Sequence, residues 1–237
     1  MSGQINTIRE KIKQLKKLDK NFTLFGSQKH RYRVNPTILL AQVQEFETTH
    51  HVTLPPEYVE FITVIGNGGV GPFYGLEPLE NGLFDDLDYK RPDSLLNPGK
   101  PFLYTEPWNA EFAETNNAEE NEQMYEEEYA KFQEQYFDNE YMNGVIAICN
   151  YGCGVSLNLV VNGPEYGNIW TDDRGSDGGI YPSCEQGNKD KISFLNWYEL
   201  WLDNSIREVQ RNFLQESEET EKEQKSNLRQ KPWWKIW

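Results

Sequence analysis

The chain has 237 residues, of which 37% are hydrophobic and 14% aromatic, enough for one generous globular domain or two small ones. Its formal net charge of -15 argues against nucleic-acid binding, which requires a basic footprint, and favours solubility or attraction to a basic partner. Three cysteines are too few, and odd in number, for a disulfide framework, so they indicate reduced thiols.

The first 33 residues carry nine basic side chains against two acidic ones, a net charge of +7. Apolar residues recur three or four apart between positions 5 and 18, which predicts a basic amphipathic helix. Such a helix can lie on a membrane or a partner, but packing on its own domain is the favoured interpretation. Because charges run through the first twenty residues, we expect neither a secretory signal nor stable membrane insertion, and a cytoplasmic location.

Two further helices are predicted before the first glycine cluster. Asn35 as an N-cap and Pro36 at the first helical position mark the start of one, which an apolar stripe follows. Pro55 and Pro56 begin the other, whose apolar residues from Tyr58 to Ile65 share one helical face.

Residues 66–71 read letter for letter as G-x-G-x-x-G, the fingerprint of dinucleotide binding. That chemistry needs a strand before the glycines and a helix after them, because the helix N-terminus must face the pyrophosphate. Here a helix precedes the glycines, and Phe73 to Leu76 have a composition that suits a strand. We therefore interpret the segment as a helix end and turn, where Gly66, Gly68 and Gly69 supply positive φ or close backbone approach, and expect no cofactor.

An acidic insert occupies residues 106–140, with twelve acidic side chains against Lys131 alone, a net charge of -11. An acidic helix from about 119 to 137 is predicted, because its apolar residues fall on one side and form an aromatic seam. These residues are Met124, Tyr125, Tyr129, Phe132 and Tyr136. Two interpretations stand level: a solvated helix docked by its seam, and an acidic platform for a basic partner.

After Gly144 the apolar period changes from that of a helix to that of a strand. Strands are predicted at 145–149, 155–161 and 168–171, and the short turns between them make an antiparallel meander. With one face covered by the helices, this is an α+β fold. The next segment, DDRGSDGG, lacks the ligands of an EF-hand loop and predicts a glycine-rich turn.

A docking helix is predicted near the C-terminus, with Phe194, Trp197 and Trp201 on one face. Beyond about 214 the sequence is charged, and we expect a mobile segment or a solvated helical extension. The last residues include Trp233, Trp234 and Trp237, which need a surface on the parent domain, a partner or a membrane. The chain thus divides into a basic helix and linker (1–33), a domain (34–206) and a charged tail (207–237).

No catalytic constellation emerges from the sequence. The histidines all lie in the N-terminal quarter, and exposed carboxylates of the acidic helix are simply ionised at neutral pH. A zinc site needs a fourth ligand beside Cys149, Cys153 and Cys184, which instead suit small buried thiols. We expect no enzyme activity and no metal.

Several segments together resemble the SUKH superfamily, in the branch that contains the fungal cell-wall assembly regulator and many bacterial immunity proteins. The most specific segment is LPPEYVEFITVIGNGGVGPFYGLEPL, and NYGCG, LNLVVNGPEYGNIWTDD, GGIYP and SFLNWYELWLD follow in order. The resemblance covers about residues 36–203. It implies an α+β fold and, for bacterial members, neutralisation of a toxin by direct binding in the cytosol.

The resemblance also implies roles for particular residues. Because family members oppose unrelated toxins, nucleases included, the shared turn residues are expected to maintain the fold: Gly66, Asn67, Gly68, Gly69, Gly71 and Pro72.

The acidic insert lies outside the shared pattern and suits a basic nuclease surface. The partner-binding residues that we expect are Tyr125, Glu126, Glu127, Glu128, Tyr129 and Glu134. The rival function is a regulatory scaffold for cell-wall synthesis or signalling partners, held through the two termini.

Overall fold

The computed structural model describes residues 3–112 and 122–229. Its α-helices are α1 (Gly3–Leu18), α2 (Ser27–His30), α3 (Leu40–His50), α4 (Pro56–Val64), α5 (Glu122–Tyr136) and α6 (Phe194–Arg229). The strands are β1 (Val145–Gly152), β2 (Val155–Val160), β3 (Ile169–Asp173) and β4 (Gly179–Pro182), and short 3-10 turns η1 (Leu79–Asn81), η2 (Asn139–Met142) and η3 (Arg174–Ser176) complete the elements.

The four strands form one antiparallel sheet in the order β1-β2-β3-β4, so each strand pairs with its neighbour in sequence. The predicted meander and the α+β class are confirmed. β4 is a strand that the sequence did not predict, because it is short and follows the glycine-rich turn directly. Trp108 pairs with Ile180 of β4 through two backbone hydrogen bonds, and so extends the sheet beyond its last strand.

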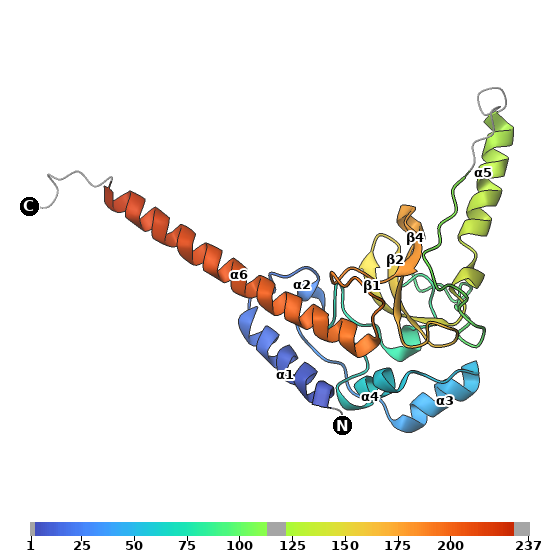
Figure 1. Cartoon of the computed structure of the whole chain (residues 1–237), viewed down its shortest axis with the longest axis horizontal. Helices are drawn as coiled ribbons and strands as arrows, with labels where there is room; N and C mark the ends of the chain where they lie inside the picture. The colour runs from blue at the N-terminus through green and yellow to red at the C-terminus, as the bar shows by residue number, and fades with distance from the viewer. Residues whose placement is uncertain (1–2, 113–121, 230–237) are drawn as a thin grey trace, which may run out of the picture.

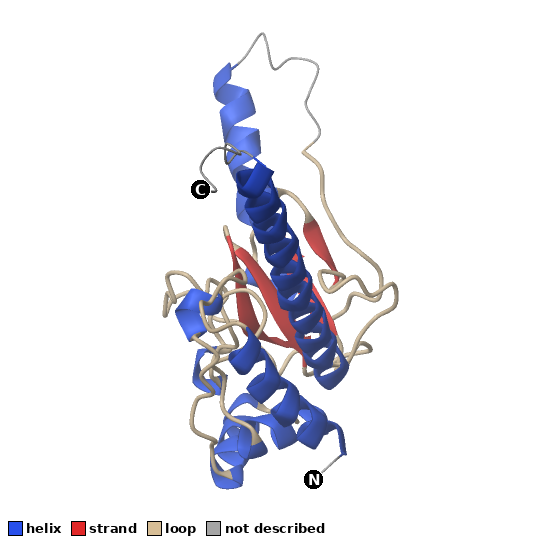
Figure 2. Cartoon of the chain, turned by 90° about the vertical axis from the view of Figure 1, so that its left-hand side faces the viewer, coloured by secondary structure: helices blue, strands red, loops and turns tan. Residues whose placement is uncertain are grey.

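Helices cover one face of the sheet and share a large apolar core with it (Figure 2). α6 supplies the predicted aromatic face to this core, and α4 packs against α6 through Phe61, whose ring lies 4.8 Å from that of Tyr198. α1 lies along α6, where Lys11 forms ion pairs with Glu199 and Asp203. The basic helix thus packs on its own chain, although the division of the chain at residues 33 and 206 stays a prediction.

The opposite face of the sheet is also covered, by the irregular segment between η1 and Phe112. Its centre is a second apolar core in which Phe102 stacks edge-on against Trp170 at 5.0 Å between ring centroids. The polar residues Ser156 and Asn158, which alternate with the apolar residues of β2, are therefore buried rather than solvated.

Two helices project from this two-sided body. α5 stands out beside β4, and the C-terminal half of α6 extends in a different direction (Figure 1). The solvated helical extension predicted beyond 214 is therefore one continuous helix with the docking segment. Phe213 and Leu214 are exposed on it, and the three tryptophans after position 230 lie outside the described residues.

Three local predictions were wrong. Asn35 does not cap a helix, because its side chain donates to the Asn67 carbonyl at 2.9 Å and α3 begins only at Leu40. The strand predicted at Phe73 to Leu76 does not form. Residues 72–75 make a turn instead, in which the Gly75 amide donates to the Pro72 carbonyl, and only Leu76 forms β-bridges to neighbouring backbone. Of the three cysteines, Cys153 and Cys184 are exposed because they lie in surface turns.

None of the helices in the described part of the chain is both long and apolar enough to cross a membrane.

Candidate protein-binding site

The glycine cluster joins α4 to the edge of the sheet. Gly69 is bridged on one side to Val34 and on the other to Leu76, which is bridged in turn to Cys149 of β1. Backbone therefore flanks Gly69 on both sides. Its φ is +98°, and a Cβ atom there would lie 2.5 Å from the Arg33 carbonyl oxygen.

The other turn residues have separate surroundings. Gly68 also has a positive φ of +85°, and Gly66 and Gly71 approach neighbouring residues closely. Asn67 is buried: its side-chain oxygen accepts from the Leu79 amide at 2.8 Å, and its side-chain nitrogen donates to Glu80 at 2.8 Å. In this arrangement the cluster is surrounded by its own chain, with a helix before it and a turn after it, so the geometry that a dinucleotide requires is lacking here.

The predicted partner-binding residues all lie on α5. Glu126, Glu127, Glu134 and Tyr129 are exposed, whereas Tyr125 and Glu128 are half-buried. The helix carries five glutamates and one lysine, so its net charge is -4. The structure brings these residues together on one projecting element, and their role in binding stays a prediction.

The aromatic seam of α5 packs on the segment that leads into it. The ring of Phe112 lies 5.2–5.4 Å from the rings of Tyr125, Tyr129 and Phe132. Lower down, Trp108 stacks against Tyr136 of the same seam at 5.7 Å. The seam thus docks the helix, as the first interpretation predicts, while most of the glutamates stay exposed. The second interpretation, an acidic platform for a basic partner, stays a prediction.

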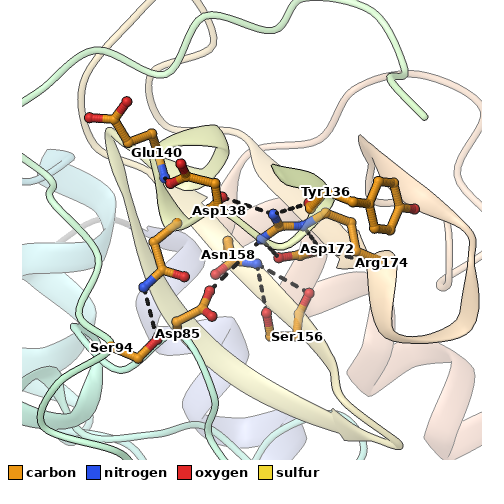
Figure 3. Close-up of polar contacts among 10 residues, drawn as sticks. Asp85, Ser94, Tyr136, Asp138, Glu140, Ser156, Asn158, Asp172 and Arg174 are labelled. Carbon is orange, nitrogen blue, oxygen red and sulfur yellow. Dashed lines mark hydrogen bonds and ion pairs between the residues drawn. The ribbon is translucent and has the colours of Figure 1, made fainter. Parts of the chain in front are cut away.

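A buried arginine fastens the base of α5 to the sheet (Figure 3). Arg174 follows β3 directly, and its Nε and Nη2 atoms donate to the two carboxylate oxygens of Asp172 at 2.8 and 2.7 Å. Its Nη1 atom donates to the carbonyl oxygens of Tyr136 and Asp138, at 2.9 and 3.0 Å. A bidentate pair of this kind has a fixed geometry, so the end of α5 is held in one position.

Acidic side chains lie close to Arg174, and the pKa values of Arg174 and Asp85 are both shifted. Burial alone would lower the pKa of Arg174, but its bonds to Asp172 and the nearby Asp85 raise it above its ordinary value. Burial, together with repulsion from Asp172, raises the pKa of Asp85 to about 6, and Arg174 only partly offsets this. The Asp85 carboxylate lies 3.9 Å from Arg174 Nη2, too far for a hydrogen bond.

A cavity of about 180 Å³ opens beside this network. Asp85, Asp86, Asp88 and Asp172 line it together with Arg174 and Phe137. Nothing among the described residues forms a group of three or more His, Cys, Asp or Glu side chains suited to a metal ion. The acidic character of α5 thus continues onto the body at its base.

Sequence reasoning missed both Arg174 and Trp108. Arg174 lies within a segment that reads as a glycine-rich turn, and the two carbonyl groups that it binds at the end of α5 are 36 and 38 residues away in sequence. One signal was present: an arginine placed two residues after a strand aspartate. Trp108 carried no signal of its pairing with β4, because that strand was not predicted.

Comparison with known families identifies the chain. The model of the SMI1 / KNR4 family (SUKH-1) matches residues 37–203, which include the glycine turn, the sheet and the start of α6. Neither the curated proteins nor the solved structures gave a match. Because the matched range spans more than two thirds of the sequence, the protein belongs to the SMI1 / KNR4 family (SUKH-1).

Proposed function

We propose that the protein is a cytoplasmic immunity protein that neutralises a toxin by binding it directly, with α5 as the principal contact. The observation that carries the proposal is the pairing of charge and rigidity in α5. Exposed glutamates stand clear of the body, while Arg174 and Trp108 hold the base of the helix. A preorganised contact surface loses little conformational entropy on binding.

The sign of the charge specifies the kind of partner. A surface of one charge sign raises the association rate with an oppositely charged protein, and a toxin must be captured before it acts. Nucleases present basic surfaces to their substrates, so a nuclease toxin would find in α5 a substitute for the phosphate backbone.

The direct test takes the product of the reading frame next to this gene as the candidate toxin. Expressed alone, it should arrest growth of a host cell, and co-expression of the full chain should restore growth. The variant Glu126→Lys/Glu127→Lys/Glu128→Lys should restore growth poorly. A matched control places three reversals on exposed acids elsewhere: Glu10→Lys/Glu45→Lys/Asp93→Lys. Equal rescue by both variants would remove α5 from the interface.

A regulatory scaffold is the second candidate function, and the exposed half of α6 is the observation that favours it. Phe213 and Leu214 are 69% and 63% exposed, beyond the part of α6 that packs in the body. A scaffold that binds through this segment should lose its partners when residues 213–237 are deleted, whereas a toxin inhibitor that uses α5 should not. Deletion of residues 1–33 is not a clean test, because α1 buries Ile5, Ile8 and Leu15 in the main core.

A further inference from the structure

One position on α5 combines an accessible aromatic ring with neighbouring carboxylates. Tyr129 is 39% exposed, although its ring also contacts Phe112 at 5.2 Å between centroids. Tyr125 stacks parallel to Tyr129, with ring centroids 6.1 Å apart and planes 5° apart, and is itself half-buried. Tyr129 is therefore the ring of the seam that a partner can reach most easily.

Helix geometry determines which glutamates lie on the same side of α5 as the aromatic seam. Side chains three or four positions apart are neighbours on a helix surface. Glu126 lies three positions before Tyr129, and Glu128 lies three after Tyr125 and four before Phe132. Glu128 is half-buried, as expected for a residue beside the packed seam.

The remaining two glutamates of the predicted site belong to the other side of α5. Glu127 lies four positions before Lys131, and Glu134 lies three positions after it. Glu127 also accepts a hydrogen bond from Gln123 at 3.3 Å. α5 therefore has an aromatic side flanked by Glu126 and Glu128, and a second side on which Lys131 offsets two glutamates.

The chemistry of the aromatic side distinguishes between the two basic side chains. A guanidinium group is planar, so it can stack on an aromatic ring and also donate in-plane hydrogen bonds to a carboxylate. An ammonium group is compact and strongly hydrated, so it does not stack on a ring while donating in-plane hydrogen bonds to a carboxylate. The net charge of -4 on α5 attracts either cation, so the ring is what distinguishes them.

We propose that Tyr129, with Glu126 beside it and Glu128 on the other flank of the aromatic seam, is the docking point for an arginine side chain of a basic protein partner. The inference rests on the proposed function, in which α5 meets a basic surface, and adds the residue type that α5 selects. Arginine selection would also favour a nucleic-acid-binding toxin surface, where arginine is abundant.

The test compares two peptide probes on the full-length protein, nonaarginine and nonalysine, titrated at low ionic strength. The arginine peptide should bind about two- to fivefold more tightly, the range expected of a solvent-exposed cation–π contact. Tyr129→Leu should remove this preference and Tyr129→Phe should keep it, because phenylalanine retains the ring. Circular dichroism of each variant checks that α5 stays helical.

A charge-matched pair of variants provides the second part of the test. Glu126→Gln/Glu128→Gln and Glu127→Gln/Glu134→Gln remove the same charge from the same helix. The first pair should weaken the arginine peptide about two- to fivefold more than the second.

Equal affinities for the two peptides, equal effects of the two variant pairs, or no binding of either peptide would overturn the assignment. These outcomes are distinct from failure of the proposed function, which the rescue and association experiments with the candidate toxin test separately.

Discussion

Arg174 joins three segments that lie far apart in the sequence: the end of β3, the end of α5 and the acidic loop around Asp85. Every nitrogen of its guanidinium donates to a partner in the described structure. Its side chain is only 2% exposed, so its charge depends on Asp172 for compensation. Removing one partner of a buried ion pair leaves an uncompensated charge, which is the costly case.

Arg174→Met should therefore lower the free energy of unfolding by about 3–5 kcal/mol in urea denaturation. Asp172→Asn added to that variant should recover part of the loss, since it removes the unpaired buried charge. The control Arg211→Met, on the exposed surface of α6, should change stability by less than about 0.5 kcal/mol. A loss for Arg174→Met no larger than that of the control would mean that the network is not structural.

His30 makes stability depend on pH. Its ring is buried between Tyr32 and Trp201, and Nδ1 accepts a hydrogen bond from the Tyr32 amide at 3.1 Å. Burial lowers the pKa of His30 to about 4, against a weaker opposing effect of Asp19. Between pH 6.5 and 4 the unfolded chain then binds a proton that the folded chain does not, so this contribution to stability is lost as the pH falls.

His30→Asn removes the titration but can keep an acceptor for the Tyr32 amide. The stability of the wild type relative to this variant should decline as the pH falls from 6.5 to 4, and should level off below 4. Paired urea denaturation curves across this range measure it. A difference that does not change with pH would show that His30 titrates normally in the folded protein.

For single residues, the sequence predicts which apolar side chains are buried better than it predicts which residues contact one another. The apolar positions of α4 and α6 follow from their spacing, because each helix buries one face. The burial of Ser156 and Asn158 does not follow, since alternation along β2 says nothing about what covers the second face. Arg174 was hidden for the same reason: its partners are set by tertiary packing.

α5 is the element whose position the structure explains most fully. Trp108 is held by backbone bonds to Ile180, and its ring stacks on Tyr136 at 5.7 Å and on Tyr141 at 4.5 Å. Aromatic pairs of this type contribute about 0.5–1.5 kcal/mol each beyond their buried area. The ring thus links the edge of the sheet to the base of the projecting helix.

Trp108→Ala should loosen α5 without unfolding the body. Hydrogen exchange of the α5 amides should become about tenfold faster, from the loss of the two stacking contacts, while amides of β1 and β2 keep their protection. Trp108→Phe, which keeps a ring at this position, should be intermediate. Unchanged exchange in α5 would show that Trp108 does not order the helix, and would leave Arg174 and Phe112 as the residues that do.

Gly69 of the glycine turn can be compared with Gly167, a glycine of similar φ elsewhere in the chain. Gly69 and Gly167 both have positive φ, +98° and +89°, but only Gly69 has backbone within contact distance of an added Cβ. Gly167→Ala should cost about 1–2 kcal/mol in strain alone, and Gly69→Ala should cost clearly more. Equal losses in thermal or urea denaturation would show that close backbone approach at Gly69 is not what requires glycine.

Elements were predicted from sequence unevenly. The position of α5 along the chain was predicted because its seam has strong helical spacing, and β1 to β3 because their apolar runs end in clear turns. The predicted start of α3 was wrong because the Asn35 side chain can either cap a helix or bind the glycine turn. In the structure it donates to the Asn67 carbonyl of that turn. β4 is too short to produce a pattern of its own.

The whole molecule is a two-sided sheet with two projecting helices. The family-matched residues 37–203 include α5 and its connections, although the acidic character of this helix was read as an addition to the shared pattern. α5 carries a net charge of -4 and α6 exposes Phe213 and Leu214, so the two projections differ in surface chemistry. The overall arrangement could not be predicted from sequence, because neither projection has a sequence pattern that fixes its direction.

The central claim is that α5 captures a basic partner through its charge. Stopped-flow association of the full chain with the toxin from the neighbouring reading frame tests it most directly. Glu126→Lys/Glu127→Lys/Glu128→Lys should lower the association rate about tenfold or more at low salt, and the difference should shrink as salt is raised, because salt screens the attraction. An association rate that is the same for both proteins at low salt would contradict the account.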